Sequence, residues 1–339
     1  MRPIFTQIFG KAQAFLTKPS MASRVTAPAP WITGSQQCTL DTCPISLAHI
    51  TYLPNLAGNA FYVALFAFLI LSQLAIGIRT RTWSFMGSTV CGLILEVLGY
   101  AARIKMRSNP FIDRWFTMYI VCLTIAPAFL SAAIYVSLAR IVAVYTTSVS
   151  RIKQRSYSII FVACDIVSLL LQAAGGAITT SDEASTIQAG INIMLAGLAA
   201  QVASLTLYLG ICLDLAWRIY RLSFRTKGTG SPGTDSVENN GFALYPDFAG
   251  LRASRSWGSF LVLQGLATIC IYVRSVFRVA ELSGGFDSHL ANDEVTFMAL
   301  EGAMISLAAI ALSTWGHPGI GFQGRWSELD YAMFSRTRK

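Results

Sequence analysis

Several ionisable and amide side chains lie inside long apolar stretches of this sequence, at spacings that place them on common helix faces. Glu96, Tyr100 and Arg103 follow one another at i, i+4 and i+7, a spacing that keeps side chains on one face. Ionisable groups within a bilayer are costly and usually face the interior of a bundle. The sequence therefore predicts a polar interior lined by several helices. The other expected members are Arg140, Asp165, Gln172, Gln201, Arg274, Arg278, Glu281, Glu294 and Glu301.

Acids and bases in such an interior suit two different roles. A carboxylate is the natural partner of an ammonium group at low dielectric, so Glu96, Asp165 and Glu301 would face the headgroup of a cationic amphipath. In this hypothesis the arginines keep the three acids ionised when no cargo is bound. The alternative is that acids and bases form interhelical pairs that only fix helix packing. Side chains near the ends of apolar stretches, such as Arg103 and Arg140, could instead extend to the membrane interface.

The elements that must position these side chains are seven apolar stretches, because a helix needs about 20 residues to cross a bilayer. Only 13% of the 339 residues are charged and 54% are hydrophobic, a balance too apolar for a water-facing surface. Backbone polar groups in lipid must be satisfied within the segment, so each stretch is expected to be helical. The predicted fold is an all-α integral membrane protein, a bundle of seven transmembrane helices. The expected spans are residues 56–78, 84–104, 117–142, 157–179, 188–213, 257–280 and 293–315.

Arginine and lysine are concentrated in alternate loops, and cytosolic loops carry such an excess. The loops after the first, third and fifth expected spans and the end of the chain are basic. By contrast, the segment around Asp182 and the segment 284–292 contain neither lysine nor arginine. This asymmetry predicts an N-terminus outside the cell and a C-terminus in the cytosol. The loop after the second span disagrees with this orientation through Arg103, Lys105, Arg107 and Arg114.

The parts of the chain outside the spans predict a simple division. Residues 1–50 are expected to form a disordered tail, 51–320 the membrane domain and 321–339 a cytosolic tail. Within the membrane domain, residues 226–250 are rich in Gly, Ser, Pro and Asn, which is typical of a flexible cytosolic loop.

Cysteines and motifs limit the chemistry further. Cys38 and Cys43 precede the first span, and either a small disulfide loop or two free thiols would fit them. The sequence contains no G-x-x-x-x-G-K-[ST] phosphate loop, H-E-x-x-H motif or C-x-x-C pair. We therefore expect no ATP motor of that type, no metal site, no cofactor and no enzymatic activity. Because topology explains the basic residues, no nucleic-acid partner is expected either.

The run L-E-V-L-G-Y-A-A-R, from Leu95 to Arg103, resembles the second-helix signature of a fungal family of seven-helix membrane proteins. This family is named for resistance to aminocholesterol (RTA-like) and is also called the lipid-translocating exporter family. Further blocks resemble its third to seventh helices in order, and the resemblance covers about residues 50–320. These blocks are Ala126–Arg140, Asp165–Gly176, Gly197–Gln201, Arg274–Glu281, Gly284, Glu294 and His317–Gly319.

This resemblance implies a protein that exports or translocates amphipathic lipids, such as sphingoid long-chain bases or sterol-like molecules. Protection against toxic amphipaths and drugs at the plasma membrane is implied equally. Membrane lipids are then the expected partners, and the resemblance names no protein partner. Two other functions remain open at this point: a seven-helix sensor or receptor, and a regulator of lipid asymmetry that transports nothing itself.

Overall fold

The computed structural model describes residues 52–145, 154–178, 184–228, 248–283 and 293–326, together with Leu40 and Ile50. Within these residues the regular structure is entirely helical, and seven spans are long and apolar enough to cross a membrane. The predicted fold class and number of spans are therefore confirmed. The predicted cysteine pair, Cys38 and Cys43, lies outside the described residues.

The first six spans are longer than the apolar stretches predicted, because polar end turns continue the helices, whereas the seventh, residues 294–313, lies within its predicted stretch. The first five are α2 (Leu56–Thr80), α3 (Trp83–Ser108), α4 (Asp113–Tyr145), α5 (Gln154–Ile178) and α6 (Ala184–Gly228). The sixth is α8 (Arg255–Ser283), and the seventh combines α9 (Glu294–Phe297), the π-helix η7 (Met298–Ala303) and α10 (Met304–Ser313).

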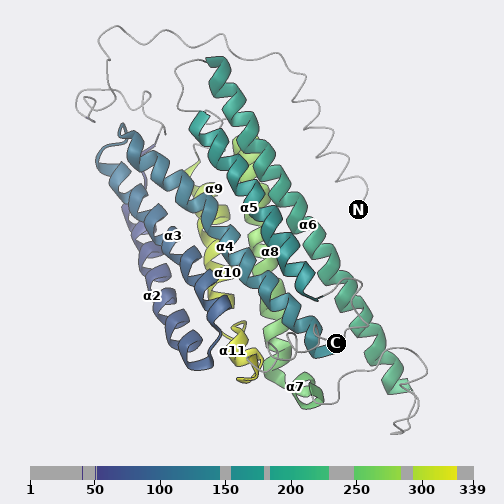
Figure 1. The fold of residues 1–339 in the computed structure, drawn as a ribbon. Helices are drawn as coiled ribbons and strands as arrows, with labels where there is room; N and C mark the ends of the chain where they lie inside the picture. The colour runs from purple at the N-terminus through teal and green to yellow at the C-terminus, as the bar shows by residue number, and fades with distance from the viewer. Residues whose placement is uncertain are drawn as a thin grey trace.

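Two short helices, α7 (Ala249–Ala253) and α11 (Pro318–Gly321), lie at the same end of the bundle (Figure 1). Helix α6 and helix α7 both enter the segment 226–250 that was predicted to be a flexible loop. That prediction therefore placed both edges of the loop inside helices, because Arg225 and Lys227 extend α6 by further turns.

Consecutive spans are neighbours in space, and the ring closes where α10 packs against α2 (Figure 1). Helix α4 also contacts α8 across the bundle and is the most buried of the spans. Helices α2 and α5 present most of their apolar surface outward, with large exposed side chains such as Phe68 and Leu170. An outer surface of this kind is suited to lipid, so the polar groups must be satisfied inside.

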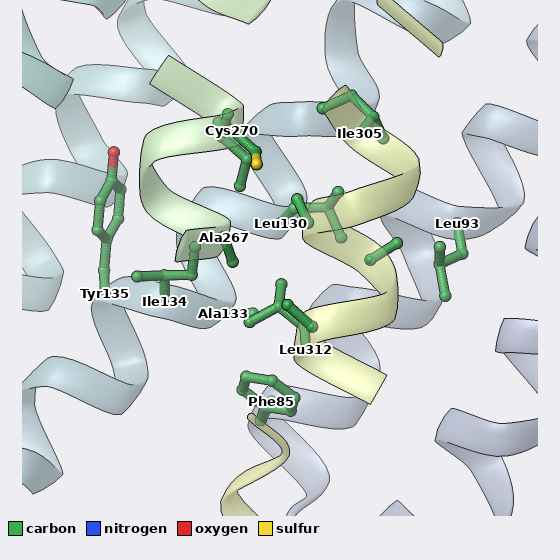
Figure 2. Packing of buried hydrophobic residues seen from close by; sticks show 14 of the residues in the cluster. Phe85, Leu93, Leu130, Ala133, Ile134, Tyr135, Ala267, Cys270, Ile305 and Leu312 are labelled. Atoms are coloured by element: carbon green, nitrogen blue, oxygen red, sulfur yellow. The ribbon is translucent and has the colours of Figure 1, made fainter. Parts of the chain in front are cut away.

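The core between α3, α4, α8 and α10 is built from small and branched side chains. Figure 2 shows Leu130 and Ala133 of α4 facing Leu312 of α10, with Ala267 of α8 nearby. These four side chains are almost fully buried. Small residues at helix contacts allow close approach of the backbones, which favours packing where lipid supplies no hydrophobic drive.

Glycines on both helices allow α5 and α6 to approach each other closely. A side chain at Gly197 of α6 would meet the Ser168 carbonyl oxygen at 2.7 Å, and one at Gly175 of α5 would meet the Gly190 carbonyl oxygen at 2.6 Å. Both contacts are with backbone, which cannot move aside as a flexible side chain can. Close approach of these helices therefore depends on the absence of a side chain at both positions.

Candidate functional site

One charged cluster collects most of the predicted polar residues on the inner faces of α3, α8 and the seventh span. It is called the charged cluster below and consists of Glu96, Tyr100, Arg103, Arg274, Arg278, Glu281, Glu294 and Glu301. All of them except Glu294 are buried. Sequence spacing therefore identified which faces point inward on three separate spans.

The deepest ion pair joins Arg274 of α8 to Glu301 of η7. The side chains are 1% and 2% exposed, so neither charge is stabilised by bulk water. The Arg274 guanidinium also donates to the Leu123 carbonyl oxygen. Pro127 stands four residues after Leu123 and has no N–H, so this carbonyl lacks its usual helical donor. The proline in α4 thus creates the acceptor that Arg274 fills.

A second pair, Arg278 and Glu281, lies one turn further along α8. The Arg278 Nη1 donates to Glu281 Oε2 at 2.7 Å, and its Nη2 donates to the Thr124 hydroxyl of α4 at 3.2 Å. Both arginines of α8 therefore bind consecutive residues in one turn of α4. This arrangement is compatible both with acid–base pairs that fix helix packing and with a site that binds a headgroup.

Arg103, which the loop-charge pattern assigned to the loop after the second span, lies in α3 and is fully buried. Its Nε donates to Asn59 of α2 at 3.0 Å, and its guanidinium carbon lies 4.0 Å from the Phe297 ring centroid. Glu294 is 4.0 Å from the Arg103 guanidinium and marks the rim of the cluster. This accounts for part of the disagreement with the charge rule, because Arg103 is partnered inside the bundle.

Glu96 differs from the other acids of the charged cluster. It is 2% exposed, and among the described residues it has no hydrogen-bond or ion-pair partner. It interacts at longer range with Arg274 and Glu301. The Tyr100 hydroxyl and Glu301 Oε2, which interact with the same group, also lack hydrogen-bond partners among the described residues. Unpaired oxygens from α3 and η7 therefore lie within electrostatic range of one another in the buried interior.

The π-helix sets where Glu301 projects. Sequence spacing assumed a regular α-helix through Glu294, Met298 and Glu301, whereas η7 interrupts it over Met298–Ala303. The Tyr62 hydroxyl of α2 donates to the Met298 carbonyl oxygen at 2.8 Å, and Gly302 allows the Tyr62 ring to pack against the wide turn. π-Turns within membrane helices occur frequently at functional sites.

Asp165 is buried, but it lies outside the charged cluster. It interacts with Tyr135 on α4, and Figure 2 shows Tyr135 at the opposite edge of the core from Leu93 of α3. Ser131 lies one turn before Tyr135 on α4. These residues, with Ser204 of α6, form what is called the Asp165 cluster below. The expectation that Glu96, Asp165 and Glu301 share one seam is therefore corrected: helix α4 separates Asp165 from the other two.

Three further predicted residues lie apart from both clusters. Gln172 of α5 donates to Gln201 of α6 at 3.2 Å, within the close contact that the glycines allow. Arg140 stacks on Trp326 at 3.8 Å, near the end of the bundle that carries α7 and α11. These positions favour packing and interface roles for the three side chains.

Sequence reasoning missed several partners of the predicted residues. Asn59 and Tyr52 hydrogen-bond Arg103, and Tyr135 faces Asp165. None of these side chains is charged or lies in a motif with its partner, so their roles can be recognised only from the three-dimensional structure. Among these features only Pro127 could be recognised from the sequence, because a proline within a helix leaves the carbonyl oxygen four residues earlier without its N–H donor.

Comparison with known proteins identifies a family and three relatives. Residues 89–325 match the family described as RTA1 like protein. The chain is 32% identical over 290 residues to the sphingoid long-chain base transporter RSB1 of Saccharomyces cerevisiae, covering 82% of this chain and 75% of the relative. It is 29% identical over 220 residues to Protein RTM1 of the same species, covering 65% and 63% of the two chains. It is 28% identical over 223 residues to Protoporphyrin uptake protein 1 from that yeast, covering 66% and 65%.

No solved structure matches the chain. The family match covers more than half of the chain, and the RSB1 alignment extends over most of both sequences. The chain therefore belongs to the RTA1-like family, the family that its sequence blocks resemble.

Proposed function

We propose that this protein is a lipid exporter that moves a cationic amphipath, of the sphingoid long-chain base class, between membrane leaflets. The observation that carries the proposal is the Glu96 carboxyl, which has no hydrogen-bond or ion-pair partner among the described residues. It interacts electrostatically with Tyr100 and Glu301, whose hydroxyl and Oε2 are unpaired there as well. An ammonium group with neighbouring hydroxyls would use all three. One relative is named as a sphingoid long-chain base transporter, and this name agrees with a cationic headgroup.

The charges around Glu96 favour a cation over an anion. Arg274 and Arg278 are each already paired with a glutamate of the cluster, and Arg103 interacts with Glu294. Glu96 is the acid left over from this pairing. An added ammonium would balance the cluster, whereas an added carboxylate would compete with acids for arginines that are already engaged.

The headgroup would lie within the bundle while its hydrocarbon chain remains in apolar surroundings. The charged cluster extends from Glu294 at the rim to Glu96 and Arg274 deeper in, and aromatic rings line the path. Tyr119 and Phe297 each lie within 5.0 Å of the Arg103 guanidinium. Side chains arranged in this way offer successive polar partners across part of the hydrocarbon layer, which lowers the free-energy cost of moving a charge.

The orientation and the residence membrane are also part of this proposal. At the end of the bundle where α2 stops and α8 starts, Arg79, Arg81, Arg252, Arg255 and Arg325 gather. We assign this end to the cytosol, with the N-terminus outside and the C-terminus inside. Export from a cytosolic to an outer leaflet then places the protein at the plasma membrane. Transport, rather than catalysis, is the activity proposed.

The test is lipid movement by the purified protein in liposomes. A fluorescent long-chain base is added, and its outer-leaflet fraction is read with a membrane-impermeant quencher. We expect wild-type protein to speed redistribution and Glu96→Gln to slow it about tenfold or more, since a charge-assisted hydrogen bond contributes roughly 1.5–3 kcal/mol. Asp214→Asn, an acid at the α6 surface, is the matched control and should act as wild type.

The alternatives predict different results in the same assay. A receptor would bind the labelled base without redistributing it, and a regulator of lipid asymmetry would need another transporter in the liposomes. Equal rates for wild type and Glu96→Gln at equal protein content would remove the headgroup role from Glu96.

A further inference from the structure

The Asp165 cluster is a second buried polar site that the headgroup proposal does not use. Asp165 is 3% exposed, and its polar neighbour among the described residues is the Tyr135 hydroxyl, which lies close but is not aligned for an ordinary hydrogen bond. The hydroxyls of Ser131, Tyr135 and Ser204 are buried and form no well-aligned hydrogen bond there, although Tyr135 also interacts with Ser131. Buried polar atoms are nearly always hydrogen-bonded in folded proteins, so several unused groups around one carboxyl call for an explanation.

The register of α5 and α6 brings Ser204 to the level of Asp165. These helices are antiparallel neighbours, with Gln172 bonded to Gln201 on one side of this level. On the other side, the rings of Phe161 and Tyr208 lie 5.4 Å apart. Asp165 and Ser204 lie between these two contacts on the facing surfaces.

No basic group among the described residues interacts with Asp165. The titratable groups around it are Tyr135 on α4, Tyr208 and Cys212 on α6, and its neighbour Cys164 on α5. A lone carboxylate in a medium of low dielectric costs many kcal/mol, and such a group takes up a proton instead. This acid thus differs from Glu281 and Glu301, each of which is paired with an arginine.

Helix α4 connects the Asp165 cluster to the charged cluster. On one side of Pro127, Leu123 and Thr124 accept hydrogen bonds from the arginines of α8. On the other side, Tyr135 interacts with Asp165 and with Ser131. A proline within a helix leaves its two halves less firmly joined by backbone hydrogen bonds. A change at either cluster can therefore be transmitted to the other through a shift of one half of α4.

We propose that Asp165 is the proton-binding site that couples proton movement to lipid export. This inference rests on the proposed function and supplies its energy source. The Asp165 carboxylate takes a proton from one side of the membrane, forming the O–H bond of a carboxylic acid, and releases it to the other side. Exchange of one inward proton for one outward ammonium lipid leaves the net charge on each side unchanged, so the membrane potential does not oppose export.

A proton fits this site better than a metal cation does. Hard cations need about six oxygen ligands converging on one point. Among the described residues only Tyr135 interacts with the Asp165 carboxylate, which falls far short of such a ligand set. A proton needs only one carboxylate oxygen, and hydroxyl groups can donate to the ionised form or accept from the protonated form.

The experiment uses the liposome assay with an imposed pH difference and a pH-sensitive dye inside. For wild-type protein, the pH difference should speed lipid redistribution severalfold, and the dye should report proton movement that depends on added lipid. Asp165→Asn, which has the shape of the protonated acid, should keep the slow redistribution and lose both responses. Tyr135→Phe should weaken the response, and Asp214→Asn, on the surface of α6, should leave it unchanged.

A second measurement does not depend on transport. Infrared spectra of the purified protein should contain the C=O stretch of a protonated carboxylic acid in both wild type and Glu96→Gln, and Asp165→Asn should remove the band that these two share. Absence of that band in wild type would overturn the inference. So would redistribution that ignores the pH difference or follows a sodium gradient instead, while the proposed function would stand. If wild type moved no lipid at all, both would fall.

Discussion

At the scale of single residues, the interior of this protein contains two kinds of acid. Glu281 and Glu301 are paired with arginines, so their charges are neutralised within a few ångströms. Glu96 and Asp165 are equally buried and have no such pair among the described residues. The Arg274–Glu301 pair joins α8 to η7 and the Arg278–Glu281 pair lies within α8, whereas acids without such a pair are available to bind a transported group. The presence or absence of an arginine partner, rather than the degree of burial, therefore distinguishes a structural acid from a candidate functional acid.

The paired acids lead to a prediction about stability. Arg274→Met or Glu301→Gln alone leaves one uncompensated buried charge or a broken bond network, and is expected to cost about 3–5 kcal/mol. The double variant Arg274→Met, Glu301→Gln should lose much less than the two single losses combined. Thermal unfolding in detergent measures these differences.

The control for this pair is Arg218→Met, which breaks an exposed bridge to Asp214 of 2.9 Å. An exposed pair contributes about 0–1 kcal/mol, so its unfolding temperature should hardly change. Strict additivity of the two buried variants would argue against a direct Arg274–Glu301 interaction.

At the scale of helices, several close contacts depend on a group that a residue lacks, such as a side chain or a backbone N–H. Gly197 has no side chain where α6 meets α5, and Pro127 has no N–H where α4 meets α8. In η7 the α-helical hydrogen-bond pattern is interrupted at the level of Glu301. Each omission leaves room or an acceptor for a group on the next helix.

Substitution of glycines on α6 tests this view. A methyl group at Gly197 would lie 2.7 Å from the Ser168 carbonyl oxygen, so Gly197→Ala should separate α5 from α6 and cost about 1–3 kcal/mol. Gly210 lies on the same helix and has nothing within 4 Å of the added methyl. Gly210→Ala should therefore be neutral or stabilising by up to about 1 kcal/mol. Unfolding temperatures in detergent compare the two, and equal losses would contradict the proposed contact.

At the scale of the whole molecule, composition and apolar length predict the fold well. The seven spans follow from hydropathy alone, since few other structures can satisfy a backbone in lipid. Helix faces were predictable too, because Glu96 and Arg274 lie inward as their spacing required. The division into two clusters was not, since it depends on which spans are neighbours. Helical spacing shows which residues share a face but not what lies opposite, so Asp165 was grouped with Glu96.

The predicted orientation can be tested with glycosylation sites, because the sequence contains no Asn-x-Ser/Thr sequon. Trp31→Asn creates one before the first span, and Ser335→Asn creates one after the last. With the N-terminus outside, only Trp31→Asn should gain a glycan, seen as a mass shift that a glycosidase reverses. A glycan on Ser335→Asn instead would invert the topology and place the basic end outside.

The wide turn of η7 also bears on how such proteins diversify. A π-turn accommodates a residue more than an α-turn over a similar rise, so removing a single codon within Met298–Ala303 would restore a regular helix. The flanks would keep their lengths, but Glu301 would rotate away from Arg274. Insertion or deletion, normally rare inside a transmembrane segment, thus becomes a direct evolutionary route to a different cargo. Alignments that forbid gaps there would match Glu301 with residues that face elsewhere.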